Sequence, residues 1–176
     1  MKNLKFSTED YVLGAVAAFL LAVLWMGSFG SGGAKSPEEL GENVFKALKS
    51  NELGSLTGSL VRVADLKFML ESSDVPEEAK AKGLKQIQEK GEKIEKEWHQ
   101  YSQSAMSEIQ SLGIEPPRME MGTIQVELKM NGKVEEADIV VPIMEGTRKG
   151  ELRMFGIKHG QWRAMPPFRF SVKTAD

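Results

Sequence analysis

An uncharged apolar run near the start of the chain constrains this sequence more than any other feature. Residues 11–26 read YVLGAVAAFLLAVLWM, and the next three residues extend the run to 19 positions without a charge. As a helix, 19 residues span roughly 28 Å, close to the ~30 Å hydrocarbon core of a bilayer. A surface helix of a soluble protein would show a polar face, and this run has none. We therefore expect a transmembrane helix over residues 11–29.

Two other interpretations of this run stay open. The small residues at 27–34 would suit cleavage by signal peptidase, which makes a secretory signal peptide the main alternative. The run is longer than the usual apolar region of such a signal, about 7–15 residues. Glu9 and Asp10 also precede it where a signal peptide would carry positive charge. A buried helix of a soluble protein is the third interpretation.

The charges that flank the run predict its orientation. Lys2 and Lys5 precede it, and Lys35 is the one base that follows closely. The positive-inside rule then places residues 1–10 in the cytoplasm. We expect a single-pass protein of the cell inner membrane, with residues 30–35 as a Gly/Ser-rich linker. Residues 36–176 would form a domain on the periplasmic or extracellular side.

One face of the predicted membrane helix carries small residues four positions apart, which would let a second helix approach closely. These residues are Gly14, Ala18 and Ala22. Small residues are also frequent in membrane helices that make no such contact, so both interpretations stay open.

Composition excludes several kinds of chemistry. The 176 residues contain no cysteine, which excludes a disulfide framework, a thiolate metal site and a cysteine nucleophile. Two histidines are too few for a histidine-rich metal site. The formal net charge of -2 shows no bias toward nucleic acid. We expect no metal and no cofactor, and no nucleic acid partner.

The first half of the predicted domain has helical patterns. Ser36 and Pro37, followed by Glu39, form a helix start that would run to about Asn51. A second, shorter helix is expected over 60–70. A third begins after Asp74 and runs to about residue 112, with Gly83 and Gly91 as places where it could kink or break.

Apolar residues on the third helix follow a heptad-like spacing. The centre of this seam is Ile94, Trp98 and Tyr101. It would pack on the helix's own domain or on another chain. Glu92, Glu95 and His99 share another stripe that could hold a metal, although a solvated charged face is the simpler interpretation.

The second half changes to the alternation of strands. Residues 123–130 alternate strictly, and Asn131-Gly132 is a strong hairpin signal. Further strands are expected at about 134–144, 151–158 and 161–165; Pro166-Pro167 interrupts the last of them, and residues 168–172 alternate again and could extend the sheet. The fold class is therefore α+β: after the membrane helix, two or three helices pack on a curved antiparallel sheet of about four strands.

This order of elements resembles the superfamily of nuclear-transport-factor-2-like and SnoaL-like domains, which have a cystatin-like α+β fold. The likeness rests on residues 36–51, with FKALKSN at 45–51, and on the meander from Asn131-Gly132 to the HGQWR of residues 159–163. The resemblance implies a conical fold with an apolar cavity between the sheet and the long helix. Superfamily members include enzymes, lipid or peptide binders and membrane-tethered scaffold subunits.

One strand face would line that cavity. Its residues are Ile124, Val126, Leu128, Ile139, Val141, Leu152, Met154 and Trp162. An enzyme of this superfamily would need a carboxylate or histidine there, and this set has neither. We therefore expect a protein that is not an enzyme.

Tether and domain together suggest a role. We expect a non-enzymatic protein-binding or structural subunit of an envelope complex, held to membrane lipid and contacting another membrane or envelope protein, with a homo-oligomer as a further option. The alternative is an exported small-ligand or lipid-binding protein that uses the apolar cavity.

Overall fold

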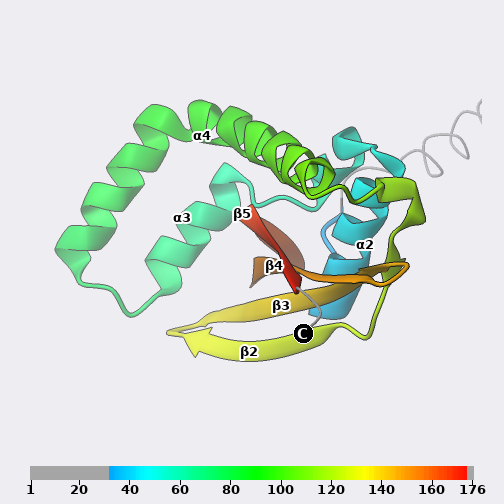
Figure 1. Ribbon diagram of the computed structural model, residues 1–176. Helices are drawn as coiled ribbons and strands as arrows, with labels where there is room; N and C mark the ends of the chain where they lie inside the picture. The colour runs from blue at the N-terminus through cyan, green and yellow to red at the C-terminus, as the bar shows by residue number, and fades with distance from the viewer. Residues whose placement is uncertain (1–31, 174–176) are drawn as a thin grey trace, which may run out of the picture. The chain divides into compact units, whose positions relative to one another are not determined.

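A computed structural model describes residues 32–173 of the chain. Within that range no helix is both long and apolar enough to cross a membrane. The predicted transmembrane segment, residues 11–29, lies outside the described residues. The chain divides into two compact units, and the second, Gly33–Asp176, contains all the elements described below. That unit is an α+β domain, in which helices precede and pack on an antiparallel sheet (Figure 1).

Helix α2 spans Pro37–Ser50 and begins as the sequence predicts. The Ser36 side-chain oxygen accepts a hydrogen bond from the Glu39 amide at 3.2 Å, which satisfies one unpaired donor of the first turn. Asn51 closes the helix in the left-handed conformation, with φ of 57°. The buried face of α2 contains Leu40, Val44 and Leu48.

The next two α-helices, α3 and α4, lie side by side (Figure 1). A short 3-10 helix, η1 (Leu53–Gly58), leads to α3 (Val63–Ser72), and α4 then runs without a break over Glu77–Ser111. The predicted break at Gly83 or Gly91 is therefore wrong, and Figure 1 shows α4 as one helix that bends along its length. A side chain at Gly91 would begin 2.8 Å from Val63, and one at Gly83 would begin 2.7 Å from Leu70. The glycines allow α3 and α4 to approach closely.

The sheet has five strands, one more than the sequence suggested. A 3-10 turn, η2 (Pro116–Arg118), precedes the strands, all paired antiparallel. Their bounds are β1 Glu120–Met121, β2 Gln125–Asn131, β3 Val134–Glu145, β4 Arg148–His159 and β5 Gln161–Lys173. Both β1 and β2 pair with β3, β3 pairs with β4, and β4 pairs with β5. The order therefore places β2 and β5 at opposite edges.

The expected interruption at Pro166-Pro167 does not occur, because β5 continues through both prolines. The register between β4 and β5 shifts between Arg153 and Phe155, opposite these prolines. Proline cannot donate a hydrogen bond to a neighbouring strand, so a local irregularity is the usual way to keep it inside a sheet. The bulge keeps both prolines inside one strand, and residues 168–172 extend the sheet as their alternation predicts.

Helix α2 packs on one face of the sheet, and the hydrophobic core lies between them. The closest side chains to Gly41 belong to Ile124, Ile139 and Val141, each 3.2 Å from the position of an added Cβ. Two segments from the helical half cover the outer edge of β5: Ala34 exchanges two backbone hydrogen bonds with Trp162, and the Ser59–Val61 segment exchanges two with Ala164. An edge strand protected in this way offers few free backbone groups for aggregation.

Candidate functional site: a charged groove on the sheet

A groove of about 760 Å³ lies on the sheet face opposite α2. The side chains of this face alternate with those of the core along each strand. Two rows of paired residues cross the groove. The first row is Gln125, Val140, Arg153 and Arg169, and the second is Glu127, Asp138, Phe155 and Met165. Val140, Phe155 and Met165 give the floor of the groove apolar area, acidic side chains lie at the β2–β3 end, and arginines lie at the β4–β5 end.

Acidic residues mark the β2–β3 end of the groove. Asp138 accepts a hydrogen bond from the Lys129 ammonium at 2.5 Å, and Glu127 lies 3.4 Å from the same ammonium. The hydrogen bond to Asp138 is the main reason that the pKa of Lys129 is raised above its usual value. These three side chains are about half or more exposed, so they form a solvated charge cluster with little effect on stability.

Basic residues mark the β4–β5 end. Arg153 and Arg169 lie directly opposite each other on adjacent strands, where like charges repel. Arg153 donates to Glu151 at 2.8 Å, which neutralises one guanidinium. Within residues 32–173 the structure shows no ion pair for Arg169, which is exposed. This end therefore presents an uncompensated positive charge beside an apolar floor.

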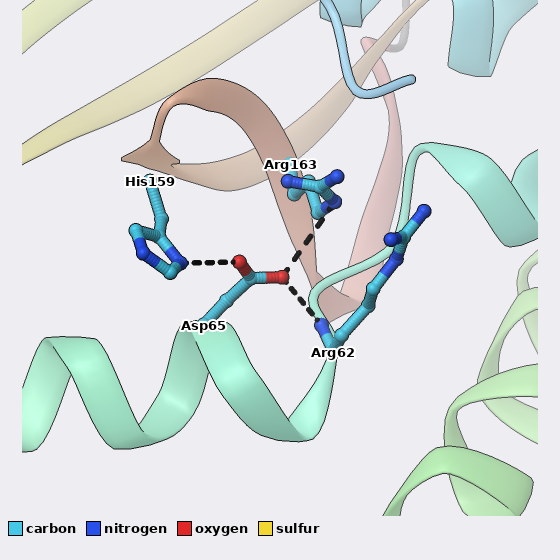
Figure 2. Close-up of polar contacts among 4 residues, drawn as sticks. All are labelled: Arg62, Asp65, His159 and Arg163. Atoms are coloured by element: carbon cyan, nitrogen blue, oxygen red, sulfur yellow. Dashed lines mark hydrogen bonds and ion pairs between the residues drawn. The ribbon is translucent and has the colours of Figure 1, made fainter. Parts of the chain in front are cut away.

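A second polar cluster connects the helices to the β4–β5 hairpin (Figure 2). Asp65, on the first turn of α3, is only 3% exposed. One of its oxygens lies 2.9 Å from His159 Nδ1, and the other accepts the Arg62 backbone amide at 2.8 Å. The Arg163 Nε lies 3.6 Å from that second oxygen. The carboxylate thus joins residues from three segments.

Burial makes the charges of this cluster important for the stability of the fold. Arg163 is 6% exposed, and its Nε has no hydrogen-bond partner. Burial lowers the pKa of the guanidinium below its usual value, while the Asp65 carboxylate opposes that shift. Asp65 is therefore the nearby negative charge that makes burial of this arginine tolerable.

The cluster has the form of a structural clamp. The ring of His159 stacks on Phe68, with centroids 4.3 Å apart and planes 6° from parallel. Asp65 and Phe68 together hold the imidazole on α3 and so fasten the tip of the hairpin. In the described part of the chain, no group of three or more metal-binding side chains gathers here or elsewhere.

The predicted cavity-lining residues lie mostly in the packed core. Ile139, Val141, Leu152, Met154 and Trp162 are buried. Ile124 and Val126 are partly buried against the core, and Leu128 is 63% exposed. The helices pack over this face, and Val126, Ile139 and Met154 also border the groove described above. The structure thus gathers most of the set in the core, and three of its members contribute to the groove.

The predicted helix seam is divided between core and solvent. Trp98 is buried, Ile94 packs against the core, and Tyr101 is 44% exposed. The structure does not describe the side chains of Glu95 and His99, which belong to the candidate metal stripe. Gly14, Ala18 and Ala22 also lie outside the described residues.

Two features were missed by sequence reasoning. Arg153 and Arg169 stand on the polar side of their strands, and alternation could have placed them on one face but not opposite each other, because the register contains a bulge. Asp65 and His159 are 94 positions apart in the chain, and no local pattern connects them.

No protein-family model, no curated protein and no solved structure matches this chain. The resemblance to nuclear-transport-factor-2-like domains therefore stays a prediction from the order of elements and the short motifs.

Proposed function

We propose that this protein is a single-pass, membrane-tethered domain that acts outside the cytoplasm as a non-enzymatic protein-binding subunit of an envelope complex. Tethering would confine the domain to the membrane surface and so raise its effective concentration near a partner in the same membrane. The groove on the open sheet face is the binding site in this proposal, and it is the observation that carries the protein-binding role.

The tether is supported by the 19 uncharged residues at 11–29 and by the short linker after them. The linker leads to Ala34, whose two hydrogen bonds with Trp162 join the entering chain to β5. The groove lies on the face of the sheet, and its acidic end is formed by β2 and β3, away from this entry edge. The entering chain therefore leaves that end of the groove accessible.

The chemistry of the groove favours a partner segment that combines apolar and acidic side chains. Phe155, Met165 and Val140 supply apolar area. Arg169 offers a guanidinium that can bind a carboxylate through two parallel hydrogen bonds. Aromatic, methionine and arginine side chains are also the types enriched in protein–protein interfaces.

Membrane fractionation tests the tether. We expect the full-length chain in the membrane pellet after a high-salt wash, with release by detergent and an intact mass that includes residues 1–31. A mass that lacks these residues would identify a cleaved signal peptide. Full-length protein in the supernatant after high-speed centrifugation would contradict the tether.

Site-specific photo-crosslinking in intact cells tests the groove. A photoreactive residue at Met165 should crosslink a defined partner, identified by mass spectrometry, and the same residue at the exposed Thr147 should not. Arg169→Glu should abolish the Met165 adduct, whereas Lys149→Glu, the same charge change at an exposed position outside the groove, should preserve it. Equal adducts at Met165 and Thr147, or no effect of Arg169→Glu, would reject this site.

A further inference from the structure

Strand β2 leaves one edge of the sheet open. Among residues 32–173, β2 pairs with β3 alone, whereas the opposite edge at β5 is covered by Ala34 and by the Ser59–Val61 segment. Two large apolar side chains stand on β2, and both point to solvent: Leu128 is 63% exposed and Met130 is 65% exposed. Natural proteins usually protect such an edge, because its free backbone groups can pair with another strand.

The sequence of this edge is complementary to itself. Residues 126–130 read VELKM, with Leu128 at the centre. In an antiparallel pair of two β2 strands centred on Leu128, Glu127 of each copy lies opposite Lys129 of the other. Val126 then lies opposite Met130, and the two Leu128 side chains face each other. Opposite charges and apolar pairs are both favourable across antiparallel strands.

Charge also selects this register over its neighbours. A pair centred on Lys129 would place two lysines opposite each other, and a pair centred on Glu127 would do the same with two glutamates. Directly opposed like charges destabilise a strand pair. Asp138 keeps its hydrogen bond with Lys129 within each copy, so in the Leu128-centred pair the lysine lies between two carboxylates.

We propose that β2 is a homodimerisation edge, at which two copies pair antiparallel about a two-fold axis through Leu128 and form one continuous ten-stranded sheet. This interface is isologous, because both copies use the same surface. The chain enters each domain at β5, the opposite edge, so pairing at β2 leaves both linkers free. The open faces of the two sheets join, and both grooves lie on the same side.

The absence of cysteine from the sequence allows a direct test by single-cysteine crosslinking of the full-length chain in its own membrane. Directly opposed residues have Cα atoms about 4.5–5.5 Å apart, within the range of about 4.4–6.8 Å that a disulfide requires. Leu128→Cys should therefore form a disulfide-linked dimer on oxidation. Its side chain is exposed, so the substitution leaves the core intact.

Two further variants test the register. Met130→Cys should not crosslink to itself, because the two positions would lie about 14 Å apart along the strands. A coexpressed mixture of Val126→Cys and Met130→Cys should crosslink, since these positions face each other. Thr147→Cys, exposed in the β3–β4 turn, measures random collision. A Leu128→Cys yield no higher than that of Thr147→Cys would overturn the proposal, and so would equal self-crosslinking of Met130→Cys.

A charge swap in the Leu128→Cys background tests complementarity. Glu127→Lys places two lysine pairs across the interface and should abolish the dimer, while it leaves the Lys129–Asp138 pair in place. The double variant Glu127→Lys/Lys129→Glu restores opposite charges and should recover the dimer. Failure of the double variant to recover it, with an unchanged circular dichroism spectrum, would contradict this register. Glu127 also lies at the acidic end of the groove, so these variants are scored by the Leu128→Cys disulfide, which forms between two copies of this chain and does not require the groove's partner.

Discussion

Asp65 is the residue at which the helical half and the sheet half are chemically joined. Its two oxygens serve the start of α3, the surface imidazole of His159 and the buried guanidinium of Arg163. A charge that is taken out of water costs several kcal/mol unless a partner is nearby, so removing one member of such a pair leaves the other uncompensated. The clamp is thus a stability feature, in contrast to the exposed charges of the groove.

Asp65→Asn tests this reasoning with a nearly isosteric change. We expect the free energy of unfolding to fall by about 3 kcal/mol, because Arg163 loses its nearby negative charge while it stays buried. The measurement is urea denaturation in mild detergent, with unfolding monitored by tryptophan fluorescence. Asp138→Asn is the matched control: it makes the same chemical change at a half-exposed ion pair and should shift the midpoint far less. Equal shifts of the unfolding midpoint in the two variants would contradict a larger contribution of Asp65 to stability.

At the scale of elements, the contact between α3 and α4 depends on residues that the helix pattern alone disfavours. Glycine weakens a helix by about 1 kcal/mol relative to alanine. Position 91 nonetheless holds a glycine in the middle of α4. The site is buried, and any side chain there would meet Val63. Packing between helices therefore decides the residue at this position, against its intrinsic helix propensity.

Gly91→Leu should destabilise the domain by about 1–3 kcal/mol, because the new side chain must force α3 and α4 apart. The gain in helix propensity offsets only part of that cost. Thermal unfolding monitored by circular dichroism measures the effect. Lys90→Leu, the adjacent and exposed position on the same helix, controls for added hydrophobicity and should leave the melting temperature almost unchanged. A melting temperature for Gly91→Leu at or above that of the parent would refute the close approach.

At the scale of the whole molecule, the described domain belongs to a unit that starts at Gly33. Its core is continuous from α2 through the sheet to α4, and includes the Ala34–Trp162 pairing at the entry of the chain. A unit with its own core can fold without the segment that precedes it. The proposed membrane attachment and the folding of the domain should therefore be separable.

Deletion of residues 2–31 tests that separation. We expect the shortened chain to leave the membrane fraction and to retain the unfolding midpoint of the full chain, since Ala34 and α2 stay intact. Deletion of residues 2–36 is the contrasting variant: it also removes Ala34 and the Ser36 cap, and should lower the free energy of unfolding by about 1–2 kcal/mol or more. Aggregation of the first variant during refolding would contradict an independent unit.

Local chemistry predicted much of the fold. The Ser36 cap predicted the start of α2, and Asn131-Gly132 predicted the β2–β3 turn, where Gly132 has φ of 60°. Alternation predicted β2, and of the face predicted to be buried Ile124 and Val126 pack against the core while Leu128 and Met130 are exposed. These signals succeed because capping, turn conformation and side-chain period depend on neighbours within a few positions of the chain.

Other features were decided by the tertiary structure alone. Neither the burial of Gly91 against Val63 nor the bond of Asp65 to His159 can be derived from local sequence, since each depends on how distant segments dock. The groove depends on a register that contains a bulge, and one shifted residue would move its arginines to another neighbour. The sequence by itself thus determined most of the elements and most of their buried faces, because short-range forces set them, whereas long-range packing decided which charges meet and which face stays open.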